Sequence, residues 1–514
     1  MIATSAWLSL GALDGGRGKM EPRGGGGGRW SVLAAVCLAA LALPWSFVGG
    51  AVATPAVGRE LGGSPQALGW VTSAFMLSFG SCLMAAGALA DQFGRKRLFG
   101  IGIALFGLVS LAICLAPDIW WLNALRAAQG LAAAAAMAGG SAALAQEYEG
   151  EARGRAFSLL GTTFGLGLAF GPLLSGYLIQ CLSWRAIFAC GAAMGLLALL
   201  LGLPRMHESR DPNAAGLDWP GACSFTAMLA LFTTALLQGP QLGWHSLLVR
   251  MLLLGSLALL LAFVWIERRV ARPMLDLSLF RYPRFVGVQC LPIATSYCYV
   301  ALLVLLPLRF IGIEGVGEVG AGLWMLALSA PMLVVPSLAV SLTRWRSAGF
   351  ISAMGLLLAA IGLLGLSQAR AGSPAMLLAL LLIGCGSGLP WGLMDGLSVS
   401  VVPKERAGMA SGIFSTTRVA GEGIALAMAG ALMALFTGKG LADAGLRTSA
   451  AVVQRLASGN LTQAHALLPM VNPARLAETY GLAFQQLLYL LIALTLLSAG
   501  MVLVFLRSET ESRV

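Results

Sequence analysis

The sequence predicts an all-α, polytopic membrane protein, and three observations carry that prediction. Of the 514 residues, 58% are hydrophobic and only 11% are charged, with a mean hydropathy of +0.83. Charged residues make up about 25% of a typical soluble domain, which needs them to cover its surface. The apolar residues form long unbroken runs such as LLALLLGL, unlike the short alternating segments of a membrane β-barrel. The 66 glycines suit close contact between helices in lipid.

The same composition excludes several classes of protein. A soluble enzyme, a disordered chain and a small disulfide scaffold all need a different balance of residues. The nine cysteines lie in or beside apolar segments without a CxxC pair, so we interpret them as core residues. The three histidines are scattered, and no nucleophile or metal-ligand spacing occurs. We therefore expect no enzyme activity, no metal and no cofactor.

The chain begins with a Gly- and Arg-rich segment, residues 1–29, which we expect to be a disordered tail or an extended start preceding an alternative initiator, Met20. Fourteen apolar segments follow, each about long enough to cross a bilayer core of roughly 30 Å. They are expected at 31–56, 67–90, 98–116, 120–146, 155–180, 184–203, 218–238, 246–267, 284–308, 319–342, 347–367, 374–402, 406–436 and 481–506.

The basic residues predict the orientation. With both termini in the cytoplasm, that side receives 22 of the 33 Lys and Arg residues, and nine fall on the other side. The net charge of +11 is thus explained by a basic cytoplasmic face, and we expect no nucleic-acid partner. The one large extramembrane piece, 437–480, mixes apolar and polar residues and predicts short amphipathic helices on the outer surface.

One loop motif follows the second expected helix. Residues 87–97 read GALADQFGRKR, so Gly87 and Gly94 permit a tight turn while Asp91 lies close to Arg95 and Lys96. An Asp in this place can cap a neighbouring helix and pair with Arg, forming a latch that breaks when the cytoplasmic side opens. The alternative interpretation is an ordinary charged loop.

This loop resembles the signature of the major facilitator superfamily, with Gln92 in place of the usual basic residue. Two further stretches are similar to motifs of that family: RAAQG, which holds Arg126 and Gln129, and GLAFGPLLSG at 167–176. The second is similar to the antiporter motif, represented here by Gly167, Gly171, Pro172 and Gly176. Pro172 removes a backbone hydrogen bond and the glycines allow close packing, so this helix is expected to bend. A bend without functional consequence is the alternative.

Three stretches point to the fourteen-helix drug:proton antiporter branch: LDWPGA at 217–222, PMLDLSLFR at 273–281, and 402–412 running on to Thr417 and Arg418. The resemblance covers about 30–507 and implies two six-helix bundles that rock around a central cavity. The implied domains are a tail at 1–29, an N-terminal bundle at 30–203, two additional helices at 204–272, a C-terminal bundle at 273–507 and a cytoplasmic tail at 508–514.

Four ionisable residues fall inside expected membrane helices: Arg126, Asp395, Arg418 and Glu422. Such residues are costly in a bilayer and indicate function by default. Glu422 lies four residues after Arg418 on one helix face, so the two form either a local ion pair or part of a proton path. Asp395 lines the cavity mouth or pairs with Arg418. We take Asp395 and Glu422 as candidate proton carriers.

The first expected helix departs from the branch. The resemblance implies an intramembrane Asp there, and this chain has Ser46 in its place, between Trp45 and Phe47. Proton coupling has then moved to Asp395 or Glu422, or is absent. With one acid fewer and Arg126 and Arg418 present, a neutral or anionic substrate is favoured. We expect Ser46, Trp45, Phe47, Arg126, Gln129, Trp391 and Arg418 to line the substrate cavity.

The expected function is export of amphiphilic small molecules across a bacterial inner membrane by proton antiport, by a monomer without nucleotide. No G-x-x-x-x-G-K-[ST] loop occurs, so an ion gradient or the substrate's own gradient must drive transport. One alternative is an exporter dedicated to one metabolite class, a siderophore or a self-made antibiotic. The other is a sensor or scaffold that has lost transport, which only the missing acid supports.

Overall fold

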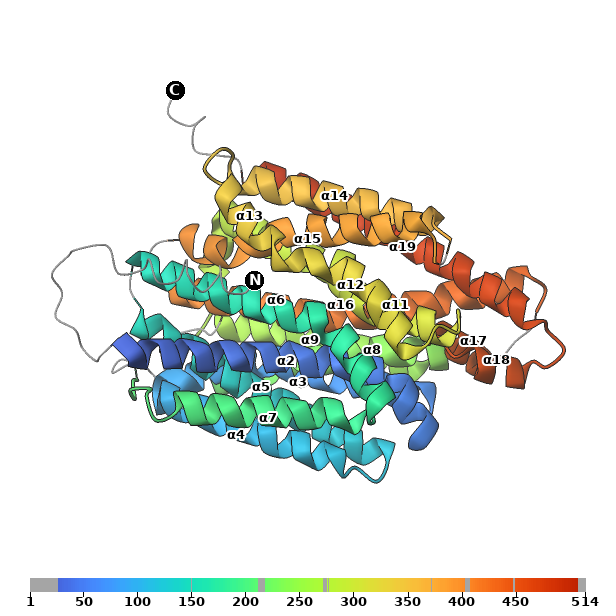
Figure 1. The fold of residues 1–514 in the computed structure, drawn as a ribbon, viewed down its shortest axis with the longest axis horizontal. Helices are drawn as coiled ribbons and strands as arrows, with labels where there is room; N and C mark the ends of the chain where they lie inside the picture. The colour runs from blue at the N-terminus through green and yellow to red at the C-terminus, as the bar shows by residue number, and fades with distance from the viewer. Residues whose placement is uncertain are drawn as a thin grey trace.

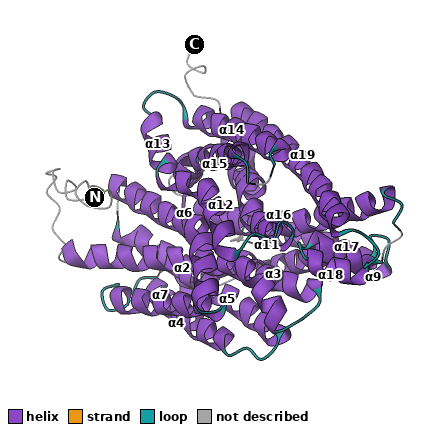
Figure 2. Ribbon diagram, turned by 45° about the vertical axis from the view of Figure 1, so that its right-hand side comes forward, coloured by secondary structure: helices purple, strands orange, loops and turns teal. Residues whose placement is uncertain are grey.

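The computed structural model describes residues 26–148, 150–210, 218–270, 275, 277–370, 372–402, 407–446 and 449–506. Over these residues the chain is helical and contains no strand (Figures 1 and 2). Residues 1–25 and 508–514, where the sequence predicts two tails, lie outside the described part. The first helix begins at Gly26, five residues before the expected start, so the last residues of the predicted tail are helical.

The first half of the chain forms eight long helices whose starts follow ordinary capping chemistry. Ser64, Asp118, Asp218 and Ser246 each accept a hydrogen bond from a backbone N–H in the following turn. The helices are α2 (Gly26–Glu60), α3 (Pro65–Phe93), α4 (Arg95–Cys114), α5 (Ile119–Glu147), α6 (Gly150–Cys181), α7 (Arg185–Gly202), α8 (Trp219–Leu242) and α9 (Leu247–Glu267).

The second half contains two spans that are interrupted by a different helical geometry. A π-helical turn, η3 (Ser296–Val300), joins α10 (Pro283–Thr295) to α11 (Ala301–Gly312). A 3-10 turn, η4 (Ala330–Leu333), separates α12 (Glu318–Ser329) from α13 (Val335–Leu342), where the sequence predicts one helix over 319–342. The remaining elements are η2 (Leu277–Arg281), α14 (Ala348–Gln368), α15 (Pro374–Ser400), α16 (Ala407–Asp443), α17 (Ala450–Ala457), α18 (Leu461–Leu467) and α19 (Pro473–Phe505).

The expected outer loop at 437–480 is shorter than predicted. The helix α16 continues to Asp443 and α19 begins at Pro473, because a helix continues past the apolar segment by which hydropathy detects it. The amphipathic helices expected in the loop are α17 and α18, and α17 buries Val452 and Leu456.

Thirteen described helices are long and apolar enough to cross a membrane, and α6 makes fourteen when its two parts are counted as one span. The two parts of α6, 159–168 and 170–181, are inclined by 42°. Pro172 cannot donate a hydrogen bond to the carbonyl of residue 168, which is where the helix bends. The protein is a multi-pass membrane protein.

The helices pack as two bundles with an additional pair beside them. Helices α2–α7 pack on one another, and α10–α16 pack together with α19. Helix α8 packs on α9 and reaches both bundles through α3 and α16. The bundles themselves meet where α6 contacts α12 and where α3 contacts α16 (Figure 1). We call the end that holds the α2–α3 and α11–α12 connections the outer end, because the charge count predicts that orientation, and the opposite end the inner end.

Candidate functional site

An ion pair and a second acid lie where the two bundles meet. On α15 and α16, Asp395 accepts hydrogen bonds from Nη1 of Arg418, at 3.1 Å to Oδ1 and 3.3 Å to Oδ2. The Arg418 guanidinium lies 4.9 Å from the ring centroid of Phe164 on α6. On the same helix, a Cβ at Gly161 would stand 2.8 Å from Oδ2 of Asp395. The pair belongs to the second bundle and faces a helix of the first.

Glu422 lies one turn beyond Arg418 on α16. Its exposed fraction is 1%, and neither carboxylate oxygen has a hydrogen-bond partner among the described residues. Arg418 is close enough to attract Glu422 electrostatically, but its hydrogen bonds go to Asp395 instead. A buried carboxylate anion without hydrogen bonds costs several kcal/mol. This arrangement is therefore unsuited to a permanently charged acid.

Trp391 lies one turn before Asp395 on α15. Its indole packs edge-on against Tyr299 of η3, with ring centroids 6.1 Å apart, and its Nε1 would stand 3.5 Å from a Cβ at Gly165. The indole N–H has no hydrogen-bond partner among the described residues. A π-helical turn within an α-helix is frequently found at functional sites, and nothing in the local sequence SYCYV signals this one.

A second buried cation, Arg126 on α5, joins three helices of the first bundle. Its Nε donates to the carbonyl of Val71 at 2.8 Å, and its Nη1 donates to Oγ of Ser46 at 3.1 Å and to Oε1 of Gln129. The guanidinium stacks on Phe75, 4.5 Å from the ring centroid. Its exposed fraction is 0%, and no described acid pairs with it. The structure thus brings Ser46, Arg126 and Gln129 together.

Replacing Ser46 with Asp is expected to stabilise the protein. A carboxylate there would meet the unpaired Arg126 cation, and pairing a buried charge is worth more than the neutral hydrogen bond it replaces. We expect the apparent Tm of the purified protein in detergent, followed by intrinsic fluorescence, to rise by roughly 2–4 °C. Ser46→Asn, which adds a similar side chain without charge, should leave Tm unchanged. An equal response of the two variants would contradict an uncompensated charge at Arg126.

The three candidate aromatic residues do not gather at one place. Trp391 faces Gly165 of α6, whereas Trp45 lies on α2 near Gly171, about 9 Å further along α6. Phe47 is 1% exposed and packs in the hydrophobic core. The role of all three in binding stays a prediction.

The predicted latch residues form contacts within the first bundle. Arg95 donates to Oδ1 of Asp91, at 2.8 Å from Nη2, and to Gln146 of α5 at 2.7 Å. Gly94 has a φ of +113°, which provides the turn between α3 and α4. A Cβ at Gly87 would meet nothing within 4 Å. Among the described residues, none of these hydrogen bonds reaches the second bundle, and a latch role remains a prediction, also for Lys96.

The glycines of the antiporter-like motif lie at close helix contacts. A Cβ at Gly167 would stand 2.5 Å from the carbonyl oxygen of Leu41 on α2, and one at Gly171 would meet Val48 at 3.2 Å. At the outer end, a Cβ at Gly176 would stand 2.7 Å from the carbonyl oxygen of Glu318, the first residue of α12. The motif therefore packs α6 against its own bundle and against the other.

An ion pair that the sequence did not indicate joins the bundles at the same end. Nη2 of Arg59, in the last turn of α2, lies 2.9 Å from Oε1 of Glu318. Together with the contact at Gly176, this pair closes the outer ends of α2, α6 and α12 on one another. Two bundles joined at one end, with buried charges inside the membrane-spanning helices, define the fold of a membrane transporter.

The chain belongs to the Major Facilitator Superfamily, whose family model matches residues 34–426. It is 34% identical over 387 residues to the multidrug resistance protein Stp of Mycobacterium tuberculosis, covering 74% of this chain and 72% of that one. It is 33% identical over 412 residues to the puromycin resistance protein pur8 of Streptomyces alboniger, covering 78% of this chain and 81% of that one. The protein is accordingly a secondary transporter that exports small molecules.

Solved structures support the fold. A bacterial homologue of the human lysosomal transporter Spinster, in an inward-facing and unoccupied conformation, aligns with a TM-score of 0.64 at 16% identity. The alignment covers 96% of this chain and 99% of that one. A peptide transporter of the POT family in complex with sulfate aligns with a TM-score of 0.59 at 14% identity, covering 93% and 95%.

Proposed function

We propose that the protein exports amphiphilic small molecules, antibiotics among them, in exchange for protons. The observation that carries this proposal is Glu422, a fully buried acid without a hydrogen-bond partner among the described residues, one turn from the Arg418 side chain that packs on α6. When it is buried the neutral carboxyl is favoured, and when the bundles separate and water reaches it the anion is favoured. Rocking of the bundles would then couple proton release to one orientation.

The Asp395–Arg418 pair provides the second part of the coupling. Asp395 holds Arg418 by two hydrogen bonds while Glu422 is neutral. A charged Glu422, one turn away on the same helix, competes for the same guanidinium. Loss of the Glu422 proton would therefore weaken the pair that faces α6. This gives the proton a direct effect on the contact between the bundles.

Location and assembly follow from the same proposal. The excess of Lys and Arg supports a cytoplasmic position for the inner end and both termini, with the chain in a bacterial inner membrane. The same proposal takes a single chain as the transporting unit, because both bundles that must move against each other belong to it.

A second candidate is export of one dedicated class of metabolite. Two further relatives are named a tetracenomycin C resistance and export protein and a cephamycin export protein, at 27% and 31% identity. The unpaired Arg126 cation favours a neutral or anionic compound over a lipophilic cation.

Everted membrane vesicles with a respiration-generated pH gradient test both candidates. A lipophilic cation, a neutral antibiotic and an anionic siderophore are added one class at a time, and collapse of the gradient is recorded. Proton antiport predicts collapse by at least one class and none in vesicles without the protein. Collapse by one class alone supports the dedicated exporter. No collapse by any class, with transport of the same compounds still measurable, would contradict proton coupling.

A further inference from the structure

A cavity separate from the cluster of Asp395, Arg418 and Glu422 lies between the additional helix pair, α8 and α9, and both bundles. Residues of α3, α8, α9, α10, η2, η3 and α16 line it, and its volume is about 560 Å³. Pockets that bind small molecules typically measure about 300–1,000 Å³. We call this cavity the side pocket. It exists only because α8 and α9 stand against α3 and α16.

The lining of the side pocket favours an uncharged, aromatic ligand. No charged residue is found among the described residues that line it. Phe225, Phe232 and Tyr297 present ring faces or edges, and Met84 and Met228 add flexible, polarisable side chains that adapt to different shapes. A charged ligand would lose its hydration there without gaining a partner, so the pocket selects against it.

One polar group in this wall has no partner. Thr416 on α16 is 4% exposed and lines the side pocket, and its hydroxyl has no hydrogen-bond partner among the described residues. The hydroxyls of Ser256 and Tyr297, which also line the pocket, are already directed to the carbonyl of Met228 and to Sδ of Met428. The Thr416 oxygen has almost no surface open to the pocket, so it offers no contact to a ligand, and the accessible lining is apolar.

The mouth of the side pocket faces the bilayer. Leu257 and Leu260 on α9 and Phe280 on η2 line the pocket while 52%, 40% and 42% of their surface is exposed. Helix α9 is the least covered of the candidate spans, with 17% of its apolar window buried, so these residues lie at a surface that lipid covers. A lipophilic compound dissolved in the bilayer would reach the pocket without passing through water.

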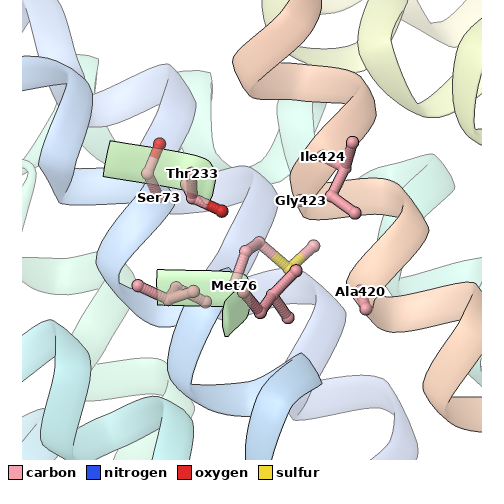
Figure 3. A pocket seen from close by; sticks show the side chains of 8 residues that line it. Ser73, Met76, Thr233, Ala420, Gly423 and Ile424 are labelled. Atoms are coloured by element: carbon pink, nitrogen blue, oxygen red, sulfur yellow. The ribbon is translucent and has the colours of Figure 1, made fainter. Parts of the chain in front are cut away.

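The side of the pocket away from the bilayer adjoins the contact between α3 and α16, where the two bundles meet. A smaller cavity shares Leu229, Ala420 and Ile424 with the side pocket, and it lies where α3, α8 and α16 meet (Figure 3). Figure 3 shows Ser73 and Met76 of α3 across from Gly423 on α16, with Thr233 of α8 beside Ser73. Helices α3 and α16 pack closely at this point, since a Cβ at Gly423 would meet Cβ of Met76 at 3.4 Å.

We propose that the side pocket is a binding site for neutral, lipophilic compounds that carry an aromatic ring, received from the bilayer. The identification of this ligand as the exported substrate rests on the proposed function. The binding itself does not, because it needs no gradient and no movement of the bundles.

Photolabelling of the full chain in lipid nanodiscs tests the site. The probe is 4-[3-(trifluoromethyl)-diazirin-3-yl]benzyl alcohol, a neutral aryl compound with one hydroxyl, and its competitor is 4-(trifluoromethyl)benzyl alcohol. Adducts are mapped by mass spectrometry of the peptides that cover 219–242 and 407–443. We expect saturable labelling of both peptides, displaced by the competitor and reduced at least about fivefold in Met228→Trp and in Leu257→Trp, which fill the cavity.

The control is Leu254→Trp, a substitution on the lipid-facing side of α9 at a residue that is 62% exposed and does not line the pocket. It should leave labelling unchanged. A second arm uses a phospholipid with a diazirine in its acyl chain. Labelling of the same peptides by the lipid alone, or labelling that neither the competitor nor the two Trp variants reduce, would overturn the site. Saturable labelling combined with no proton movement in vesicles would leave the site standing and refute the proposed antiport.

Discussion

Replacing Glu422 with Gln is expected to remove the collapse of the pH gradient by substrate while leaving substrate–substrate exchange intact. Gln has the shape of the neutral carboxyl that the buried site favours, so packing of α16 is preserved. The Gln side chain cannot bind and release a proton, so transport by the variant should no longer depend on pH. Substrate affinity should change by no more than about fivefold, the effect of one hydrogen bond.

The measurement compares two assays on the same vesicles: collapse of the gradient, and exchange of labelled for unlabelled substrate at equal pH on both sides. A residue with a merely structural role would lower both together. The matched control is Glu478→Gln, since Glu478 is an exposed acid on α19 at the outer end. Gradient collapse that survives in Glu422→Gln but is lost in Asp395→Asn would transfer the proton-carrying role to Asp395. Collapse that survives in both variants would refute coupling by either acid.

The cluster of Asp395, Arg418 and Glu422 shows how much of the candidate site can be predicted from the sequence. Asp395 and Arg418 are identifiable because ionisable residues inside apolar helices are rare, and their pairing was one of two possibilities that the sequence left open. The i, i+4 spacing of Arg418 and Glu422 equally permitted a local ion pair. Which acid takes the hydrogen bonds of Arg418 depends on the distance between α15 and α16, and that distance is a property of packing which no local pattern contains.

The interruptions of the helices also differ in whether the sequence contains a signal for them. The break between α12 and α13 has a signal in the sequence, because Pro331 and Pro336 each remove a backbone hydrogen bond. The π-helical turn at Ser296–Val300 has no such signal, since the residues SYCYV are compatible with an ordinary helix. The bend of α6 is the one that Pro172 and the neighbouring glycines predict. A hydropathy profile detects the apolar part of a helix but does not detect a change in the hydrogen-bond register of that helix.

The ion pair between Arg59 and Glu318 could not be predicted from the sequence, for a different reason. The two residues are 259 positions apart, and each stands at the end of an apolar segment where a charge is unremarkable in a membrane protein. Only the approach of α2 to α12 makes them partners. The neighbouring Gly176 was found through its motif, although its contact with the other bundle was not.

Replacing Gly176 with Leu is therefore expected to lower export by at least about tenfold. Even a Cβ at this position would stand 2.7 Å from the carbonyl oxygen of Glu318, which is backbone and cannot rotate away. The outer ends of α6 and α12 would have to separate, and overpacking of this kind costs about 1–3 kcal/mol. A cost of 1.4 kcal/mol reduces the population of the outer-closed state about tenfold, and the transport cycle must pass through that state.

The measurement is efflux of the substrate identified by gradient collapse, at matched amounts of protein in the membrane. Gly176→Ala should give an intermediate loss, because the same contact is strained by a single methyl group. Gly500→Leu on α19 is the matched control, since a Cβ there meets nothing within 4 Å. Normal efflux by Gly176→Leu would mean that this contact opens and closes without cost. In that case the Arg59–Glu318 pair, whose Arg59 side chain is 62% exposed, would have to close the outer end alone, and an exposed pair is worth only about 0.2–1 kcal/mol.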